Sequence, residues 1–163
     1  MATENPEAVN LSGVESRAPC GVTCVYFSAS RAPIDEPTLI LNGDGKGPIN
    51  NLCFPNLVSP SYAPAGKTLV SVSVLDADPS DSIVDEVRSQ LVEWFGREAA
   101  DYEHLRTYKI PFALPSQTSL NPVEKRAEIR PGLYRCGDDC DTASINGAMA
   151  SGRRAAEAAA GIL

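Results

Sequence analysis

Two adjacent aspartates, Asp138 and Asp139, stand between two short stretches of contrasting composition near the C-terminus. Residues 132–137 (GLYRCG) predict a strand, and residues 144–160 are rich in alanine, glycine and serine and predict a helix. A strand that turns sharply into a helix is where open α/β sheets bind ligands, outside the carboxyl end of the strand. The carboxylate of Asp138 at such a turn can accept hydrogen bonds from ligand hydroxyl groups.

The start of the predicted helix supplies the complementary chemistry. The N–H groups from Ser144 to Gly147 lack intrahelical partners and carry partial positive charge, so they suit an electron-rich ligand oxygen such as a carbonyl or a phosphate. An internal glycine costs a helix about 1 kcal/mol relative to alanine. Gly147 and Gly152 therefore indicate that another backbone, or a ligand, approaches closely. A terminal helix that only packs closely against its sheet explains the same pattern, and residue types alone give the two interpretations equal weight.

The same segment resembles the C-terminal FAD motif of the flavin amine oxidase and phytoene desaturase superfamily. That motif reads roughly G-L-Y-x-x-G-D, a variable loop, then S-x-x-G-A-x-x-S-G-x-x-A-A. The matching residues are Gly132, Leu133, Tyr134, Gly137, Asp138, Ser144, Gly147, Ala148, Ser151, Gly152, Ala155 and Ala156.

By this resemblance, Asp138 would bond the ribityl chain of FAD, and the N–H groups near Ile145 and Asn146 would face the pyrimidine edge of the flavin. The turn from Asp138 to Ser144 is shorter than in many relatives, which leaves the role of Asp139 open. The cofactor-binding set that we expect is Gly137, Asp138, Asp139, Ser144, Ile145, Asn146 and Gly147.

The function implied by the resemblance is that of an FAD-dependent, amine oxidase-like oxidoreductase, which transfers hydride from a small organic substrate to the flavin. Amines, carotenoid-like polyenes and porphyrinogens are all substrates within the superfamily, and no residue here discriminates among them. The catalytic residues are likewise not assigned.

One part of the superfamily's pattern is missing. The G-x-G-x-x-G strand–turn–helix that cradles the FAD pyrophosphate is absent from the 163 residues, and so is the Glu that grips the adenosine ribose. The chain is therefore expected to be the C-terminal portion of a two-domain enzyme without the N-terminal dinucleotide-binding βαβ unit. A truncated gene, a separately encoded N-terminal half that acts as a partner, and an inactive relic all fit. Because each lost charge-assisted hydrogen bond is worth about 1.5–3 kcal/mol, we expect the chain alone not to hold FAD tightly or turn over.

The remaining sequence predicts an α+β fold, with an α/β remnant beside an antiparallel sheet of about four strands. Strands are predicted at 21–30, 38–43, 67–75 and 102–114, and a helix at about 80–95, where apolar residues recur at helical spacing. Residues 42–48 (NGDGKGP) predict a hairpin turn, whereas 49–66 predict an irregular stretch and 115–129 a polar connection. By resemblance, residues 1–17 and 126–163 belong to the FAD-binding domain and residues 18–125 to the substrate domain.

The alternative is a non-enzymatic acidic binding module, stabilised by zinc through two C-x3-C pairs, Cys20/Cys24 and Cys136/Cys140. Residues four apart in a strand lie roughly 13 Å apart, which disfavours a shared metal for the first pair. Buried, reduced thiols explain the cysteines better, and they suit a reducing, non-secretory compartment. The single histidine, His104, lies near a predicted strand and is interpreted as structural or solvent-facing.

Charge and hydropathy exclude several partners. The net charge of −7 argues against nucleic acid and anionic membranes, which need clustered Lys and Arg. No apolar run approaches the ~20 residues of a membrane span, and the acidic N-terminus lacks the features of a signal peptide. These observations predict a soluble, intracellular protein whose compartment is otherwise undetermined.

Overall fold

The computed structural model describes residues 7, 10, 13, 19–75, 78–116 and 125–161. Its contacts divide the chain into two compact units, one of Met1–Cys20 with Phe112–Leu163 and one of Gly21–Pro111. Isolated positions aside, the segment 1–17, expected to belong to the FAD-binding domain, lies outside the described residues.

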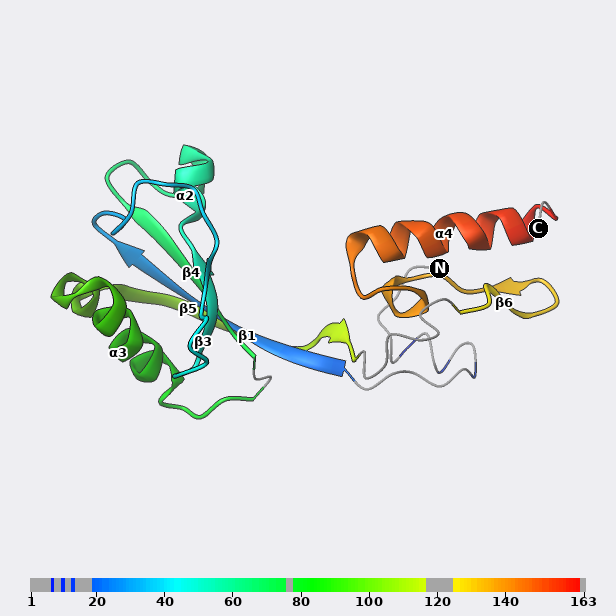
Figure 1. Ribbon diagram of the computed structural model, residues 1–163, viewed down its shortest axis with the longest axis horizontal. Coiled ribbons are helices and arrows are strands. Elements are labelled where there is room, and N and C mark those ends of the chain that lie inside the picture. Colours follow the sequence, from blue (N-terminus) through cyan, green and yellow to red (C-terminus); the bar gives the residue numbers. More distant parts are fainter. Residues whose placement is uncertain are drawn as a thin grey trace. The chain divides into compact units, whose positions relative to one another are not determined.

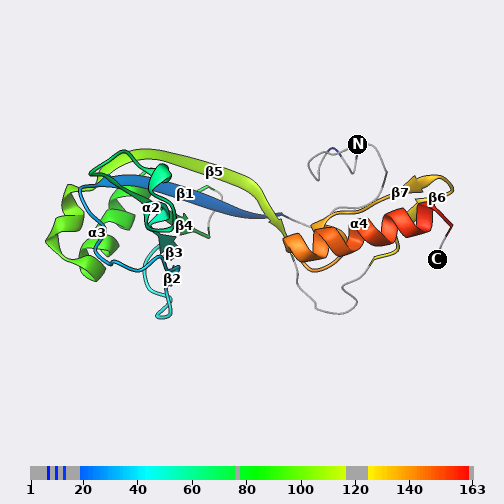
Figure 2. The same ribbon diagram turned by 90° about the horizontal axis from the view of Figure 1, so that it is seen from above.

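The unit Gly21–Pro111 is built on a five-stranded sheet of order β2-β3-β4-β1-β5. β1 pairs antiparallel with β4, β4 with β3, and β3 with β2, so these pairings confirm the expected antiparallel sheet. Figure 2 shows β5 running beside β1. The strands are β1 (Pro19–Ala29), β2 (Ile40–Leu41), β3 (Ile49–Cys53), β4 (Thr68–Val74) and β5 (Glu103–Pro115).

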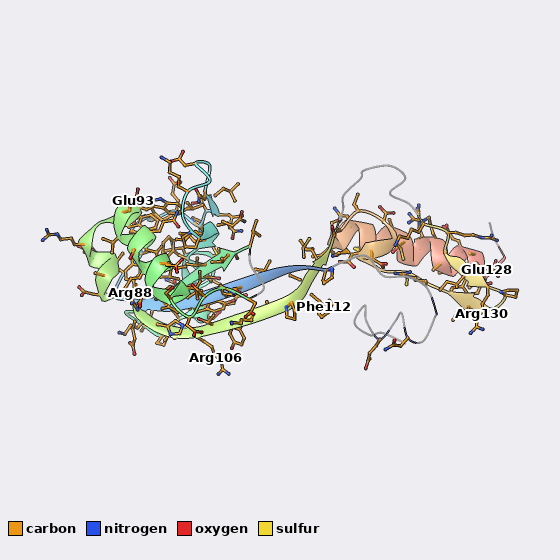
Figure 3. The ribbon with its side chains drawn as sticks, turned by 90° about the horizontal axis from the view of Figure 1, so that it is seen from below. Arg88, Glu93, Arg106, Phe112, Glu128 and Arg130 are labelled. Carbon is orange, nitrogen blue, oxygen red and sulfur yellow. The ribbon has the colours of Figure 1, made fainter. Side chains whose placement is uncertain are left out.

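The core lies between one face of this sheet and helix α3 (Ile83–Phe95) (Figure 1). Alternate residues of β1 and β4, such as Val25 and Val72, are fully buried, as expected of strands with one covered face. From α3, Val87 and Leu91 are buried against them. Arg88 of α3 also lies against the sheet, with its guanidinium 5.6 Å from the centre of the Phe27 ring (Figure 3). The helix predicted at about 80–95 is thus confirmed, and it ends at Gly96, whose φ of 87° favours glycine.

The prediction of an irregular stretch at 49–66 is wrong at its start, because β3 lies there, between β2 and β4. Its register shifts between Ile49 and Asn51, and its buried residues are Ile49 and Leu52, three positions apart. An irregularity of this kind breaks the period-two pattern by which a strand is recognised in a sequence. The stretch continues with the short helix α2 (Pro55–Val58) and a 3-10 helix (Pro60–Tyr62).

The turn predicted at 42–48 joins the antiparallel strands β2 and β3. The side chain of a buried glutamine of α3, Gln90, forms hydrogen bonds with the backbone at the end of this turn. Gln90 accepts a hydrogen bond from the Ile49 N–H (3.0 Å), and its amide donates to the Lys46 carbonyl (2.7 Å). The side chain of Asn42 donates to the same carbonyl (2.8 Å) and to that of Ile49 (2.7 Å). Gly47 has φ of 71°, and the side chain of Gln90 occupies the space that a Cβ would need.

The other unit contains a two-stranded hairpin and helix α4 (Ile145–Ala159) (Figure 1). Its strands are β6 (Glu128–Arg130), with Glu128 and Arg130 labelled in Figure 3, and β7 (Leu133–Tyr134). β6 corrects the prediction that 115–129 is only a polar connection, since three residues are too few to show a strand periodicity. The chain is therefore a mixed α+β protein. No helix within the described ranges is long and apolar enough to cross a membrane.

We expect Gln90→Leu to lower the free energy of unfolding by about 1–3 kcal/mol, because it leaves the buried Ile49 N–H without a partner. Urea unfolding followed by the fluorescence of Trp94, the single tryptophan, measures the change. Glu93→Gln is the control, since Glu93 is exposed on the same helix and its replacement is expected to change stability by less than ~0.5 kcal/mol. Equal effects of the two substitutions would contradict the role given to Gln90.

Candidate functional site

A strand, a turn and a helix follow one another at residues 133–159, as predicted, but the strand covers only two of the residues 132–137 expected to form it. β7 ends at Tyr134, a 3-10 helix follows at Asp138–Cys140, and α4 begins after Ser144. Ser144 caps α4, because its hydroxyl accepts the Gly147 N–H (3.0 Å) and its carbonyl accepts the Ala148 N–H (2.9 Å). Within the described part of the chain, the N–H groups of Ile145 and Asn146 are left without an acceptor.

The two adjacent aspartates have different surroundings. Asp139 is 7% exposed, pairs with Arg135 and with Lys125 (3.4 Å), and accepts a weak hydrogen bond from the Cys140 thiol (3.3 Å). Asp138 is half-buried, and its side chain makes no hydrogen bond or ion pair with any residue that the structure describes. The carboxylate of Asp139 is therefore occupied by the protein itself, whereas that of Asp138 is available.

An arginine from the middle of α4 holds the second half of the turn. Arg154 donates to the Asp141 carboxylate (2.6 Å) and to the Cys140 carbonyl (3.2 Å). The pKa of Asp141 lies below its ordinary value, chiefly because its carboxylate accepts the Thr142 backbone N–H and also because of Arg154. The turn is thus tied to the helix that follows it.

The two glycines of α4 have different surroundings. A Cβ on Gly147 would overlap the Thr142 carbonyl and lie 2.7 Å from the Thr142 hydroxyl. The close backbone approach predicted there is confirmed, and the approaching group is the turn itself. A Cβ on Gly152 would have no neighbour within 4 Å. The same expectation for Gly152 is not met among the described residues.

The remaining chemical candidates do not gather into a site. His104 packs edge-on against Phe27 (5.8 Å between ring centres) and its Nε2 lies 2.9 Å from the Thr107 hydroxyl. The interpretation of the cysteines as buried thiols holds for Cys140 and is wrong for Cys20 and Cys136, which are exposed. In the described ranges, no three His, Cys, Asp or Glu side chains are placed to share a metal ion.

Sequence analysis missed the residues that hold the turn. These residues are Lys125, Arg135 and Arg154. Arg135 lies four residues before Asp139 but outside the short 3-10 helix that contains Asp139, so no helical periodicity predicts their contact. The motif matches at Gly147 and Ser151 were the available signal, since both mark residues that face the turn.

Comparison with known proteins found the following similarities. A family model described as flavin containing amine oxidoreductase matches residues 20–160. An oxidoreductase from Methanosarcina mazei has a similar structure, with a TM-score of 0.57 and 17% sequence identity over 96% of this chain and 38% of that one. A protein from Pyrococcus furiosus has a TM-score of 0.44 and 18% identity over 69% of this chain and 27% of that one. No curated protein shows a significant match.

The similarity to the Methanosarcina protein concerns the fold, and this chain spans 38% of that protein's length.

We expect Gly147→Ala to destabilise α4 by about 1–3 kcal/mol, because the added methyl group overlaps the Thr142 carbonyl. Gly152→Ala is the matched control, and it should instead stabilise the helix by roughly 0.5–1 kcal/mol, since alanine is the better helix former and the space is open. Amide hydrogen exchange in α4 measures both. A stabilising effect at Gly147 would contradict the close contact.

The thiol of Cys140 should be the slowest of the native thiols to react with iodoacetamide. Burial, and next the charge of Asp139, raise the pKa of Cys140 from 9.0 to about 11. Because the thiolate is the reactive form, at pH 8 we expect alkylation of Cys140 to be about 100-fold slower in the folded chain than in the unfolded one, and slower than at the exposed Cys136. Mass spectrometry of the alkylated peptides measures the rates, and in urea the difference should vanish.

The same pKa predicts how stability depends on pH. The unfolded thiol ionises near pH 9 while the folded thiol stays protonated to about 11, so the free energy of unfolding should fall as the pH rises between these values. Cys140→Ala should remove that part of the fall. An unchanged pH dependence in this variant would contradict the raised pKa.

Proposed function

Because the chain belongs to the flavin containing amine oxidoreductase family, we propose that residues 137–147 bind the flavin end of FAD within an oxidoreductase. When bound, the flavin would supply the redox chemistry, as the acceptor of hydride from a small organic substrate. The observation that supports this most directly is the carboxylate of Asp138, which is unpaired among the described residues and lies near the start of α4, where two amides likewise have no described acceptor.

The residues at the turn fit the groups of a flavin. The ribityl chain presents hydroxyl donors, and Asp138 offers carboxylate acceptors that no described residue occupies. The pyrimidine edge presents carbonyl acceptors, and the amides of Ile145 and Asn146 are donors without partners in the described ranges. The partial positive charge at the start of α4 favours electron-rich oxygens at this position.

Asp139 and Gly137 support the turn. Asp139 is buried and engaged by Arg135 and Lys125, so it holds the turn in place and does not contact the cofactor. Gly137 has φ of 154°, in the region that favours glycine, and a Cβ there would lie 3.1 Å from the Asp139 carboxylate. A glycine therefore lets the chain pass close to the buried aspartate.

The two compact units of the chain support a proposal about which residues belong to the cofactor domain and which to the substrate domain. The hairpin of β6 and β7 and helix α4 fall in one unit and most of the sheet with α3 in the other, which agrees with the proposal that residues 126–163 belong to the FAD-binding domain. The antiparallel sheet with α3 would then be the substrate-domain part, and the substrate class stays open. The cradle for the FAD pyrophosphate would come from polypeptide outside this sequence, either a preceding segment or a separate N-terminal half.

We expect millimolar FMN, which contains the isoalloxazine and the ribityl chain, to shift the backbone amide NMR signals of Asp138, Ile145 and Asn146. ADP is the control ligand, because it represents the part of FAD that this turn does not contact, and it should leave those signals in place. With FAD added during purification the chain should stay colourless, since binding without the pyrophosphate cradle is weak. Equal shifts with FMN and ADP would contradict the proposal.

Two variants test the separate roles of the aspartates. Asp138→Asn should weaken FMN binding by about tenfold, because the amide cannot accept as the carboxylate does, while the unfolding free energy stays within ~0.5 kcal/mol. Asp139→Asn should lower the stability of the turn by about 1–3 kcal/mol, because it leaves Arg135 without its buried partner. The opposite pattern would assign the cofactor contact to Asp139.

A further inference from the structure

One buried hydroxyl of α4 contacts both backbone polar groups of Gly137. Ser151 is 2% exposed, and its Oγ accepts the Gly137 N–H (2.9 Å). The same hydroxyl donates its proton to the Gly137 carbonyl (2.7 Å), with the Ala148 carbonyl at 3.0 Å as the longer alternative. Gly137 immediately precedes Asp138, so this contact acts on the peptide that leads into the proposed cofactor ligand.

We propose that Ser151 is a positioning residue, which fixes the Gly137 peptide and thereby the carboxylate of Asp138 before the flavin binds. The inference rests on the proposed function, because the contact between Ser151 and Gly137 affects cofactor binding only if Asp138 binds the flavin.

Gly137 is the point of the turn that most needs such a restraint. Without a side chain it has more backbone freedom than any other residue type, and its φ of 154° lies where other residues rarely go. Its carbonyl has a second donor, the Cys140 N–H (3.2 Å), whereas its own N–H has Ser151 as its one acceptor among the described residues. Loss of the hydroxyl would therefore leave the N–H unpaired.

The other restraints on the turn act farther along the chain. Arg135 and Lys125 hold the carboxylate of Asp139, and Arg154 holds Cys140 and Asp141. Within the described ranges, Ser151 alone holds the residue before Asp138 from the helix. Removal of its hydroxyl should therefore loosen the approach to Asp138 and leave the later part of the turn and α4 intact.

Ser151→Ala in the full chain, labelled with nitrogen-15, tests this separation. We expect amide exchange at Gly137 to be about tenfold faster, which is the effect of losing one ordinary hydrogen bond, while exchange in the middle of α4 is unchanged. On addition of FMN, the signals of Ile145 and Asn146 should still shift, whereas the shift at Asp138 should be lost. A purely structural role would change all three signals together.

Two further variants serve as controls. Ser151→Thr retains the hydroxyl and should restore the Asp138 shift. Ser89→Ala removes a serine hydroxyl that donates to the Asp85 carbonyl one turn earlier in α3 (2.8 Å), and it should leave exchange at Gly137 and the FMN shifts as in the wild type. If Ser151→Ala does not fold, Ser151→Cys replaces it, since the thiol is close in size and a weak hydrogen-bonding group.

The outcomes separate the inference from the proposed function. Absence of any FMN shift in the wild-type chain would overturn the proposed function. An FMN response in the wild type that persists at Asp138 in Ser151→Ala, or unchanged exchange at Gly137, would overturn the role of Ser151 alone.

Discussion

The close approach of the Thr142 carbonyl to Gly147 is the contact on which the candidate site depends. It brings the turn against the first residues of α4, where a side chain larger than hydrogen would keep the two apart. The same turn contains the Ser144 cap of α4, and the hydroxyl of Ser151 and the guanidinium of Arg154 both form hydrogen bonds with it. A glycine within a helix lowers the stability of that helix. Here the hydrogen bonds between the turn and α4 offset this loss.

The acidic residues of the turn differ in whether a described residue neutralises them. Asp139 is buried and has two cationic partners, and Asp141 has Arg154, which agrees with the rule that buried charges are paired. Asp138 has no such partner among the described residues. An acidic chain with a net charge of −7 thus neutralises the acids that shape the turn and leaves available the one we assign to the ribityl hydroxyls.

The sheet unit depends on a different interaction, the burial of one face of β1, β3 and β4 against α3. Gln90 is buried among the apolar residues of α3, and its side chain forms hydrogen bonds with backbone groups at the start of β3 and in the turn before it. It therefore links the helix to the β2–β3 turn. The match to the flavin containing amine oxidoreductase family, at residues 20–160, includes parts of both units. The residues assigned to the cofactor all lie in the unit that contains α4.

Patterns of short range could be recognised from the sequence by itself: the helical stripe of α3, the alternation of β1 and β4, the glycine-rich turn before β3, and the FAD motif at the C-terminus. Each depends on neighbours along the chain, whose spacing the backbone geometry determines. Tertiary structure decided the rest. It made a strand of residues 49–53 despite their irregular register. Among the described residues, it placed a backbone against Gly147 but not against Gly152, and it buried Asp139 with partners while Asp138 has none. The strand and the buried aspartate depend on contacts with residues distant in sequence, such as Gln90 and Lys125, which no local pattern specifies. The approach to Gly147 comes from the nearby Thr142, but it depends on the conformation of a turn that Arg154 holds from ten or more residues away.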